Sequence, residues 1–404
     1  MAYKKLIFLI LSIIFQQSSS LNILFITPTK LPTVTGNSID IHRLTTGLEQ
    51  LGHQTLVFTP DAINIETILE FKPDIIHAFH GFKSRRAVAI AHHLHIPYVL
   101  TLSGTDYNQC LLDPAKAAQT EDTILKASHL ITFNNTGLNN TGMNALIKKH
   151  PELKEQCSII RRGEPHCDAN HYDFRERFNF NEDDFIYLHV AGIRPVKNNL
   201  MPIHLLEKLH EQHPNVKLAF VGSILDQEYF TQFQDAIKDK DWIRYLGPLP
   251  HDDIWQAYKG CNVAINCSQS EAESLAVIEA MYMQKPIIAS AIPSNTIFIK
   301  EGRTGLQCFL SVPIDLYNAA RTFYNDPRYR AALAQGAHDF IMDYFNTDEI
   351  KEYATGVNVL HLKADHIKSY KFPIPPQKMR DDFSSFYSVT DEKFSKDEFE
   401  KMVL

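Results

Sequence analysis

The sequence lacks an excess of basic residues and lacks paired cysteines. Its 404 residues carry 40 Lys and Arg against 47 Asp and Glu, a net charge of −7. No broad positive field attracts nucleic acid, and none is predicted as a partner. The six cysteines are scattered without a C-x-x-C pair, which favours free buried thiols over a zinc site or a disulfide framework. A D-x-D metal motif in a suitable context is also missing, so no metal site is predicted.

A hydrophobic run long enough to span a membrane is missing from the N-terminus. Residues 6–15 are apolar except for Ser12, but this run is about half as long as the roughly 20 residues that a spanning helix needs. With a lysine pair before it and serines after it, the segment 1–20 resembles a secretory signal peptide. An upstream extension and a weak anchor are the alternatives, and peripheral membrane contact stays open.

The rest of the chain alternates between apolar strands and amphipathic helices. Strand-like segments at 21–27 and 54–58 flank a helical segment at 39–51, and the alternation continues. This pattern predicts α/β domains with parallel sheets, and the length allows two or three domains. A polar stretch without an apolar period separates two such regions. The predicted division is a first domain at 21–167, a linker at 168–184, a second domain at 185–345 and a C-terminal region at 346–404.

The stretch 262–290 is the most informative part of the chain. It reads as a strand at 262–267, a polar loop at 268–273, a helix at 274–284 and a second strand at 286–290. The helix would begin above the carboxyl end of a parallel strand, where open α/β sheets bind ligands. The free amides of its first turn favour an anion such as phosphate.

Two acids stand out in this stretch. Glu271 lies in the loop, and Glu279 follows eight residues later in an otherwise apolar helix. The pair can hold two hydroxyl-bearing groups on either side of a diphosphate, because carboxylates accept hydrogen bonds from hydroxyls. The alternative is a helix-capping acid and a solvated acid, although the apolar neighbours of Glu279 speak against solvation.

Basic and glycine residues follow other predicted strands. Arg194 and Lys197 stand three residues apart at a strand end and can neutralise a diphosphate together, or form a solvated basic pair. Gly36 occupies the usual place of a phosphate loop but is a lone glycine, which makes a weak dinucleotide fingerprint. His251 opens an acidic run that we interpret as a helix N-terminus and not as a metal site.

The spacing Glu271-x7-Glu279, followed by Lys285-Pro286 and later by Thr304-Gly305, resembles the donor site of retaining GT-B glycosyltransferases of family 4, the glycosyl transferases group 1. The resemblance covers about 21–344. It implies an α/β GT-B fold of two facing Rossmann-like domains with parallel sheets and an interdomain cleft, in which the last helix crosses back to the first domain.

The same resemblance implies a metal-independent hexosyltransferase-type activity that retains the anomeric configuration and needs no cofactor. The co-substrate would be a nucleotide-sugar, UDP- or GDP-linked, and the acceptor an unknown glycan, lipid or small molecule. Catalysis would rest on Glu271, Arg194 and Lys197. The donor-binding residues it implies are Gly36, Arg194, Lys197, Gly222, Leu249, Glu271, Ser274, Leu275, Ala276 and Glu279.

The first domain would bind the acceptor through His80, Thr105 and Asp106. Asp106 can instead cap a turn. His77, near the end of the strand that His80 follows, is expected to be a core imidazole. Since nucleotide-sugars must be at hand, the compartment stays open between the cytoplasm and the secretory lumen.

The chain departs from the family pattern directly after Glu271. Relatives usually carry glycine there, which allows close backbone approach, whereas this chain has Ala272, Glu273 and Ser274. Glu273 would repel a diphosphate unless it points elsewhere. This keeps open a catalytically silent GT-B protein that binds a nucleotide-sugar or a partner, and the signal-like start keeps open an exported two-lobed solute-binding protein.

Overall fold

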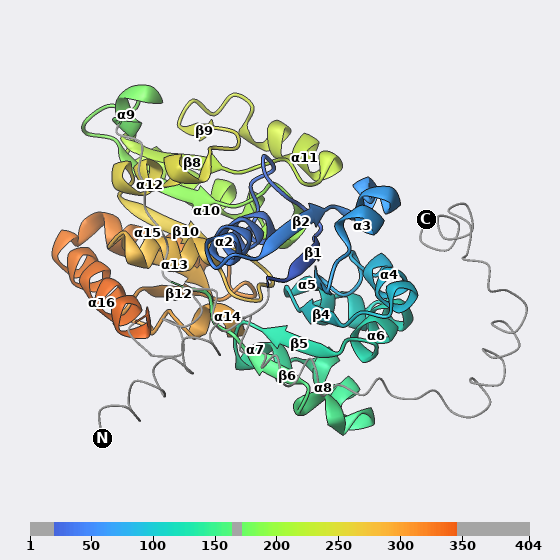
Figure 1. Cartoon of the computed structure of the whole chain (residues 1–404). Coiled ribbons are helices and arrows are strands. Elements are labelled where there is room, and N and C mark those ends of the chain that lie inside the picture. Colours follow the sequence, from blue (N-terminus) through green and yellow to red (C-terminus); the bar gives the residue numbers. More distant parts are fainter. Residues whose placement is uncertain (1–19, 164–171, 346–404) are drawn as a thin grey trace, which may run out of the picture.

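The computed structural model describes residues 20–163 and 172–345, which form two α/β domains (Figure 1). The signal-like segment, apart from Ser20, and the C-terminal region 346–404 lie outside these residues. No helix within the described ranges is long and apolar enough to cross a membrane.

The first domain is a six-stranded parallel sheet in the order β2-β1-β3-β4-β5-β6. Its strands are β1 (Asn22–Ile26), β2 (Gln54–Phe58), β3 (Ile75–Phe79), β4 (Tyr98–Thr101), β5 (His129–Thr132) and β6 (Cys157–Ile159). Its α-helices are α2 (Gly36–Gln50), α3 (Ile65–Phe71), α4 (Arg86–Leu94), α5 (Thr105–Asn108), α6 (Ala117–Leu125), α7 (Asn135–Leu138) and α8 (Thr141–Lys149). Short 3-10 turns are η1 (Pro60–Ala62), η2 (Cys110–Leu112) and η3 (Pro151–Lys154).

The second domain has a six-stranded parallel sheet in the order β12-β11-β10-β7-β8-β9. Its strands are β7 (Phe185–Val190), β8 (Val216–Val221), β9 (Ile243–Tyr245), β10 (Val263–Asn266), β11 (Ile287–Ser290) and β12 (Leu306–Cys308). Its helices are α9 (Phe174–Arg177), η4 (Pro195–Lys197), α10 (Leu200–Gln212), α11 (Gln227–Ile237), α12 (His251–Gly260), α13 (Leu275–Tyr282), α14 (Pro293–Thr296), α15 (Ile314–Asn325) and α16 (Pro327–Phe345).

The central strands are continuous apolar runs because helices cover both faces of each sheet. In β1, Leu24, Phe25 and Ile26 are fully buried, which is typical of parallel sheets. The first domain gathers around one large apolar cluster, and the second has two, one on each face of its sheet. The predicted α/β class and the two parallel sheets are confirmed.

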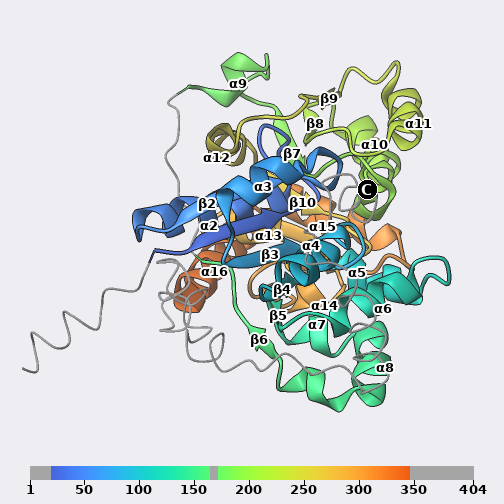
Figure 2. The same ribbon diagram turned by 45° about the vertical axis from the view of Figure 1, so that its right-hand side comes forward.

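The topology sets the place of a binding site. The strand order reverses between β1 and β3 in the first sheet and between β7 and β10 in the second. Crevices open at the carboxyl ends of strands at such reversals. The helices that follow, α2 and α13, lie side by side between the two halves in both views (Figures 1 and 2). A Cβ atom on Gly36 of α2 would lie 3.8 Å from Leu275 of α13.

The stretch predicted as a linker differs from that prediction where it is described. Residues 172–184 include α9, and Phe174 and Phe180 are buried in the second domain's apolar cluster. Phe174 packs so closely on α12 that a Cβ on Gly260 would meet its ring at 2.5 Å. Two buried aromatic side chains attach this segment to the domain, but its apolar residues follow neither a helical nor a strand period. The sequence pattern therefore indicated a linker. We place 172–184 with the second domain.

Candidate functional site

A cavity of about 330 Å³ lies between the two domains, at the low end of the range for ligand pockets. Both domains contribute to its walls. Twelve of the thirteen predicted site residues line it, namely Gly36, His80, Thr105, Arg194, Lys197, Gly222, Leu249, Glu271, Ser274, Leu275, Ala276 and Glu279. Asp106 is the predicted residue that does not.

Lys197 and Glu271 form an ion pair in the cavity wall. The ammonium lies 2.5 Å from Glu271 Oε1, with side chains 16% and 11% exposed. Ser268 donates a second hydrogen bond to the same oxygen at 2.7 Å. Burial works against the charged carboxylate, but Lys197 and Ser268 more than offset it and hold the pKa of Glu271 below its ordinary value. Glu271 is therefore anionic at neutral pH.

Arg194 is the second predicted cation and lies on the loop after β7. Burial lowers the pKa of its guanidinium, and Glu271 opposes this change; an arginine stays charged throughout the physiological range. Within the described residues its buried Nε has no hydrogen-bond partner. A half-buried cation with an unused buried donor is suited to an incoming anion.

The N-terminus of α13 opens into the cavity. Ser274 stands at the cap position, but its side chain makes no capping hydrogen bond, because its hydroxyl accepts from Asn266 at 3.0 Å. The amides of the first turn thus keep their donors for another group, and the helix dipole favours an anion there.

Glu279 lies further along α13 and is 4% exposed. Its Oε1 is 2.9 Å from His251 Nε2, and the Tyr258 hydroxyl is 3.4 Å from Oε2. His251 lines the cavity at the start of α12. The prediction that 251–253 begin a helix is confirmed, but it missed the contact of His251 with Glu279. No spacing signals that contact, because the two residues lie on different helices.

Of the three residues predicted on the acceptor side, two line the cavity and one does not. His80 and Thr105 line the cavity, with His80 Nε2 2.8 Å from Thr105 Oγ1. The carboxylate of Asp106 instead accepts from four backbone amides, those of Gly81, Ser103, Gly104 and Tyr107, at 2.8–3.1 Å. Asp106 is fully buried and holds the turn between β4 and α5, the alternative that the sequence left open.

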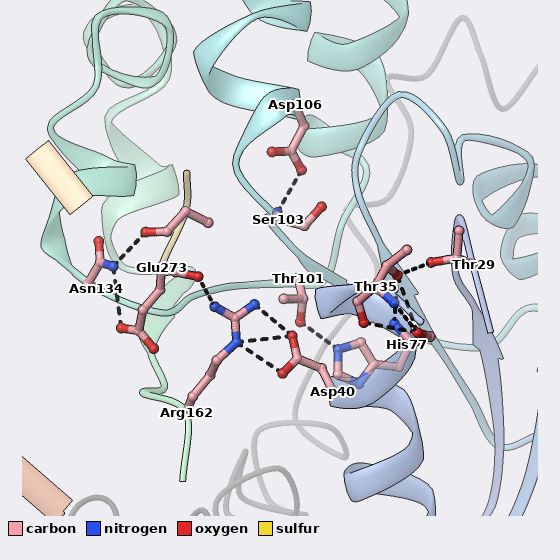
Figure 3. A network of polar contacts seen from close by, with 12 residues as sticks. Thr29, Thr35, Asp40, His77, Thr101, Ser103, Asp106, Asn134, Arg162 and Glu273 are labelled. Atoms are coloured by element: carbon pink, nitrogen blue, oxygen red, sulfur yellow. Dashed lines mark hydrogen bonds and ion pairs between the residues drawn. The ribbon is translucent and has the colours of Figure 1, made fainter. Parts of the chain in front are cut away.

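His77 is a core imidazole, as expected from the sequence. Its Nε2 lies 2.7 Å from Thr101 Oγ1, a contact drawn in Figure 3. Burial lowers the pKa of His77 to about 3, so it is neutral.

The loop that carries Glu271 contacts the first domain through a hydrogen bond and an apolar side chain. Asn134 donates to the carbonyl oxygen of Ala272 at 2.8 Å, and Ala272 joins the apolar cluster of the first domain. Gly104 has φ +111°, and a Cβ on it would lie only 2.7 Å from the Ala272 amide nitrogen. The two loops approach each other closely because Gly104 carries no side chain.

Arg162 joins the two domains, lines the cavity and was not predicted. Figure 3 shows its guanidinium between Asp40 and Glu273. It donates from Nε and Nη2 to the Asp40 carboxylate of α2, the latter at 2.7 Å, and from Nη1 to the Glu273 carbonyl oxygen. It also lies 3.9 Å above the Phe133 ring. A bidentate buried arginine fixes α2 against the loop before α13.

Glu273 faces the domain boundary. Its Oε2 lies 3.5 Å from the Asn134 amide and 3.4 Å from the hydroxyl of Tyr344, near the end of α16. Within the described residues Oε1 has no partner. Burial raises the pKa of Glu273 to about 7, although Arg162 opposes this. Glu273 lines the cavity and is about half protonated at pH 7, so it repels a diphosphate less than a fully charged carboxylate would.

No group of three or more His, Cys, Asp or Glu within 20–163 and 172–345 is arranged to hold a metal ion.

Two facing parallel α/β domains with a polar cavity between them define the GT-B class of folds. Residues 171–340 match the family model described as Glycosyl transferases group 1. This match covers the second domain and supports the resemblance drawn from the sequence.

Relatives and solved structures agree with that class. The chain is 24% identical over 320 residues to Glycosyltransferase 1 domain-containing protein 1 of Xenopus tropicalis, covering 76% of this chain and 89% of the relative. It is 22% identical over 319 residues to glycogen synthase of Mycobacterium tuberculosis, covering 77% and 74%.

Among solved structures, Anabaena HepE in complex with UDP-glucose superposes with a TM-score of 0.64 and 17% identity, covering 84% of this chain and 99% of that one. A glycosyltransferase from Rickettsia africae gives a TM-score of 0.64 and 18% identity, covering 87% and 100%. At these identities the likeness shows the fold alone.

Proposed function

We propose that this chain transfers a sugar from a nucleotide-sugar to an acceptor with retention of the anomeric configuration. The observation that carries the proposal is the convergence of two cations, two carboxylates and one helix N-terminus on a single cavity. A diphosphate needs the cations and the helix amides, and the sugars on either side of it need the carboxylates.

Each residue takes one role in this mechanism. Arg194, Lys197 and the first-turn amides of α13 stabilise the diphosphate as it leaves, where negative charge grows in the transition state. Glu279, oriented by His251, holds the ribose hydroxyls, and Glu271 holds hydroxyls of the transferred sugar. These cations supply the charge that a metal ion supplies in other transferases.

No protein nucleophile is assigned, since Glu271 is already engaged by Lys197 and Ser268. The acceptor oxygen bonds to the anomeric carbon while the bond from that carbon to the phosphate oxygen breaks. The departing phosphate receives the electron pair and then the proton of the acceptor hydroxyl.

The donor is proposed to be UDP-linked, since HepE, a protein of the same fold, has been solved in complex with UDP-glucose. A thermal-shift screen of the full chain against UDP, GDP, ADP and their sugars tests this. We expect UDP to give the largest stabilisation, about 2.7 kcal/mol at a hundredfold excess over its Kd.

Arg194→Ala and Glu279→Ala should both abolish the shift, because each removes a donor contact. Arg177→Ala is the matched control, since its exposed guanidinium pairs with Asp253 within the second domain. No shift with any nucleotide would refute the proposal.

A further inference from the structure

The first-domain wall of the cavity carries a lysine that the donor site does not use. Lys83 follows β3 on the turn before α4 and lines the cavity with His80, Ser103 and Thr105. It faces the side on which the acceptor is expected. The chemistry of this wall therefore bears on what the acceptor is.

His80 sets the direction of the hydrogen bonds on this wall. Burial lowers its pKa to about 4, so the ring is neutral. The backbone N–H of Lys83 donates to His80 Nδ1 at 3.3 Å, which leaves the ring proton on Nε2. His80 Nε2 thus donates to Thr105 Oγ1 at 2.8 Å, and the Thr105 hydroxyl keeps its own hydrogen for a ligand.

Ser103 adds a second hydroxyl donor. Its Oγ is buried and has no hydrogen-bond partner among the described residues, while its backbone amide is held by Asp106 at 3.0 Å. An unsatisfied buried hydroxyl in a cavity wall is a group that a ligand can pair.

Lys83 forms no salt bridge within the described ranges. Asp106 is a nearby acid, but backbone amides take its carboxylate oxygens, and its charge raises the pKa of Lys83 less than burial lowers it. Burial lowers the pKa of Lys83, and the charge of Arg194 lowers it further. A buried ammonium beside the like charge of Arg194 is stabilised by a bound anion.

We propose that the acceptor carries an anionic group, a phosphate or a carboxylate, bound by Lys83 with the hydroxyls of Thr105 and Ser103. The inference rests on the proposed function and specifies its acceptor class. Lys83 fixes the anion, and so presents a neighbouring acceptor hydroxyl to the anomeric carbon of the donor. Lys83 is a binding and positioning residue and takes no part in bond making.

Isothermal titration of the full chain tests this in two stages. The first stage measures UDP binding. The second titrates UDP-saturated protein with inorganic phosphate, glucose 6-phosphate, glucuronate and glucose, so that phosphate, carboxylate and neutral sugar are compared. We expect glucose 6-phosphate or glucuronate to bind at least tenfold tighter than glucose.

Lys83→Met should weaken the anionic probe about tenfold while the Kd of UDP stays within twofold. Lys126→Met, an exposed lysine paired with Asp122 on the first domain, should change neither. A Lys83→Met protein that loses UDP and the anionic probe equally would assign this lysine to the donor diphosphate and overturn the inference.

Binding of glucose as tight as that of both charged sugars, or binding of none of the four probes, would overturn it as well. Failure of UDP to bind in the first stage would refute the proposed function, and with it the acceptor class. Failure of the proposed function is therefore seen in the titration with UDP, and failure of the acceptor class in the titrations with the four probes.

Discussion

At the residue scale, one lysine faces two competing anions. Lys197 is paired with Glu271 in the structure, whereas in the proposed complex it also contacts the diphosphate. The carboxylate thereby holds the ammonium in place before the donor arrives, and the two charges spare each other the cost of unpaired burial.

Glu271→Gln separates the two parts of donor binding. We expect UDP affinity to stay within about threefold, because Lys197 and Arg194 remain charged. The additional affinity of UDP-glucose over UDP should disappear, since the amide replaces the charged acceptor for sugar hydroxyls. Titration calorimetry of both ligands measures this. An equal loss of affinity for UDP and UDP-glucose would contradict the role given to Glu271.

Glu273 predicts a pH dependence of stability. Its pKa is about 7 in the folded chain against an ordinary 4.5, so the folded state binds the proton more tightly than the unfolded state. Stability is therefore lost as pH rises from about 4.5 to 7 and stays lower above that range.

Glu273→Gln removes this titration. We expect the variant to match the wild type near pH 4.5 and to exceed its free energy of unfolding at pH 8 by on the order of 2 kcal/mol. Denaturant unfolding at the two pH values measures the difference. Glu211→Gln, at an exposed position of α10, is the control, and a Glu273→Gln curve parallel to the wild type would disprove the prediction.

Several residues that line the cavity could be predicted from sequence and others could not. Arg194, Lys197, Glu271 and Glu279 line it, and they were singled out because they follow strands at the sheet reversals or match the family spacing. Their roles stay predictions. Arg162 could not be found, since its contacts with Asp40 and Glu273 join positions far apart in the chain.

The orientation of residues in short turns could not be predicted from sequence either. Asp106 was predicted to face a ligand, and four amides hold it instead, because sequence does not tell which way a turn carboxylate points. Lys83 follows a strand as Arg194 does, but it carries no family spacing that singles it out.

At the element scale, the strands were predicted closely and the helix starts less so. A buried parallel strand is a continuous apolar run, so the expected segment 21–27 contains β1, whose last four residues are buried. The helix expected at 39–51 begins at Gly36, because Thr35 and Ser38 form a capping box that favours an earlier start than the first apolar residue.

Two loops that touch across the cleft give a prediction at this scale. Gly104→Ala adds a Cβ that would clash with the Ala272 amide at 2.7 Å and places alanine at a φ of +111°. Gly52→Ala is the matched control, since its φ is +88° but nothing lies within 4 Å of the added atom.

Both variants should lose about 1 kcal/mol from backbone strain, measured by denaturant unfolding. Only Gly104→Ala should also weaken UDP binding, because the clash displaces the loop that carries Glu271. Equal behaviour of the two variants in both measurements would show that the interdomain contact is unimportant.

At the scale of the whole molecule, a few buried contacts fix one domain against the other. Arg162 ties α2 to the loop before α13, and Arg161 lies 5.1 Å above the ring of Tyr344 at the end of α16. The last helix thereby reaches the first domain, in line with the crossing that the resemblance implied.

Arg162→Met should leave Asp40 buried without its partner and destabilise the fold by about 3 kcal/mol. It should also weaken UDP binding, since the two walls of the cavity lose their common support. Circular dichroism and titration with UDP measure the two effects. Arg177→Met, which removes a half-exposed guanidinium from a pair with buried Asp253 inside one domain, should cost less than Arg162→Met, because Arg177 itself is half exposed. Unchanged UDP affinity in a destabilised Arg162→Met protein would limit Arg162 to a structural role.

The position of Ala272 has a consequence for synthesis of the chain. This residue completes the apolar cluster of the first domain, although it is translated roughly 100 residues after that domain has ended. At ribosomal rates the delay is on the order of 5 to 20 s. Throughout this time the nascent first domain exposes the surface around Gly104 that Ala272 later covers.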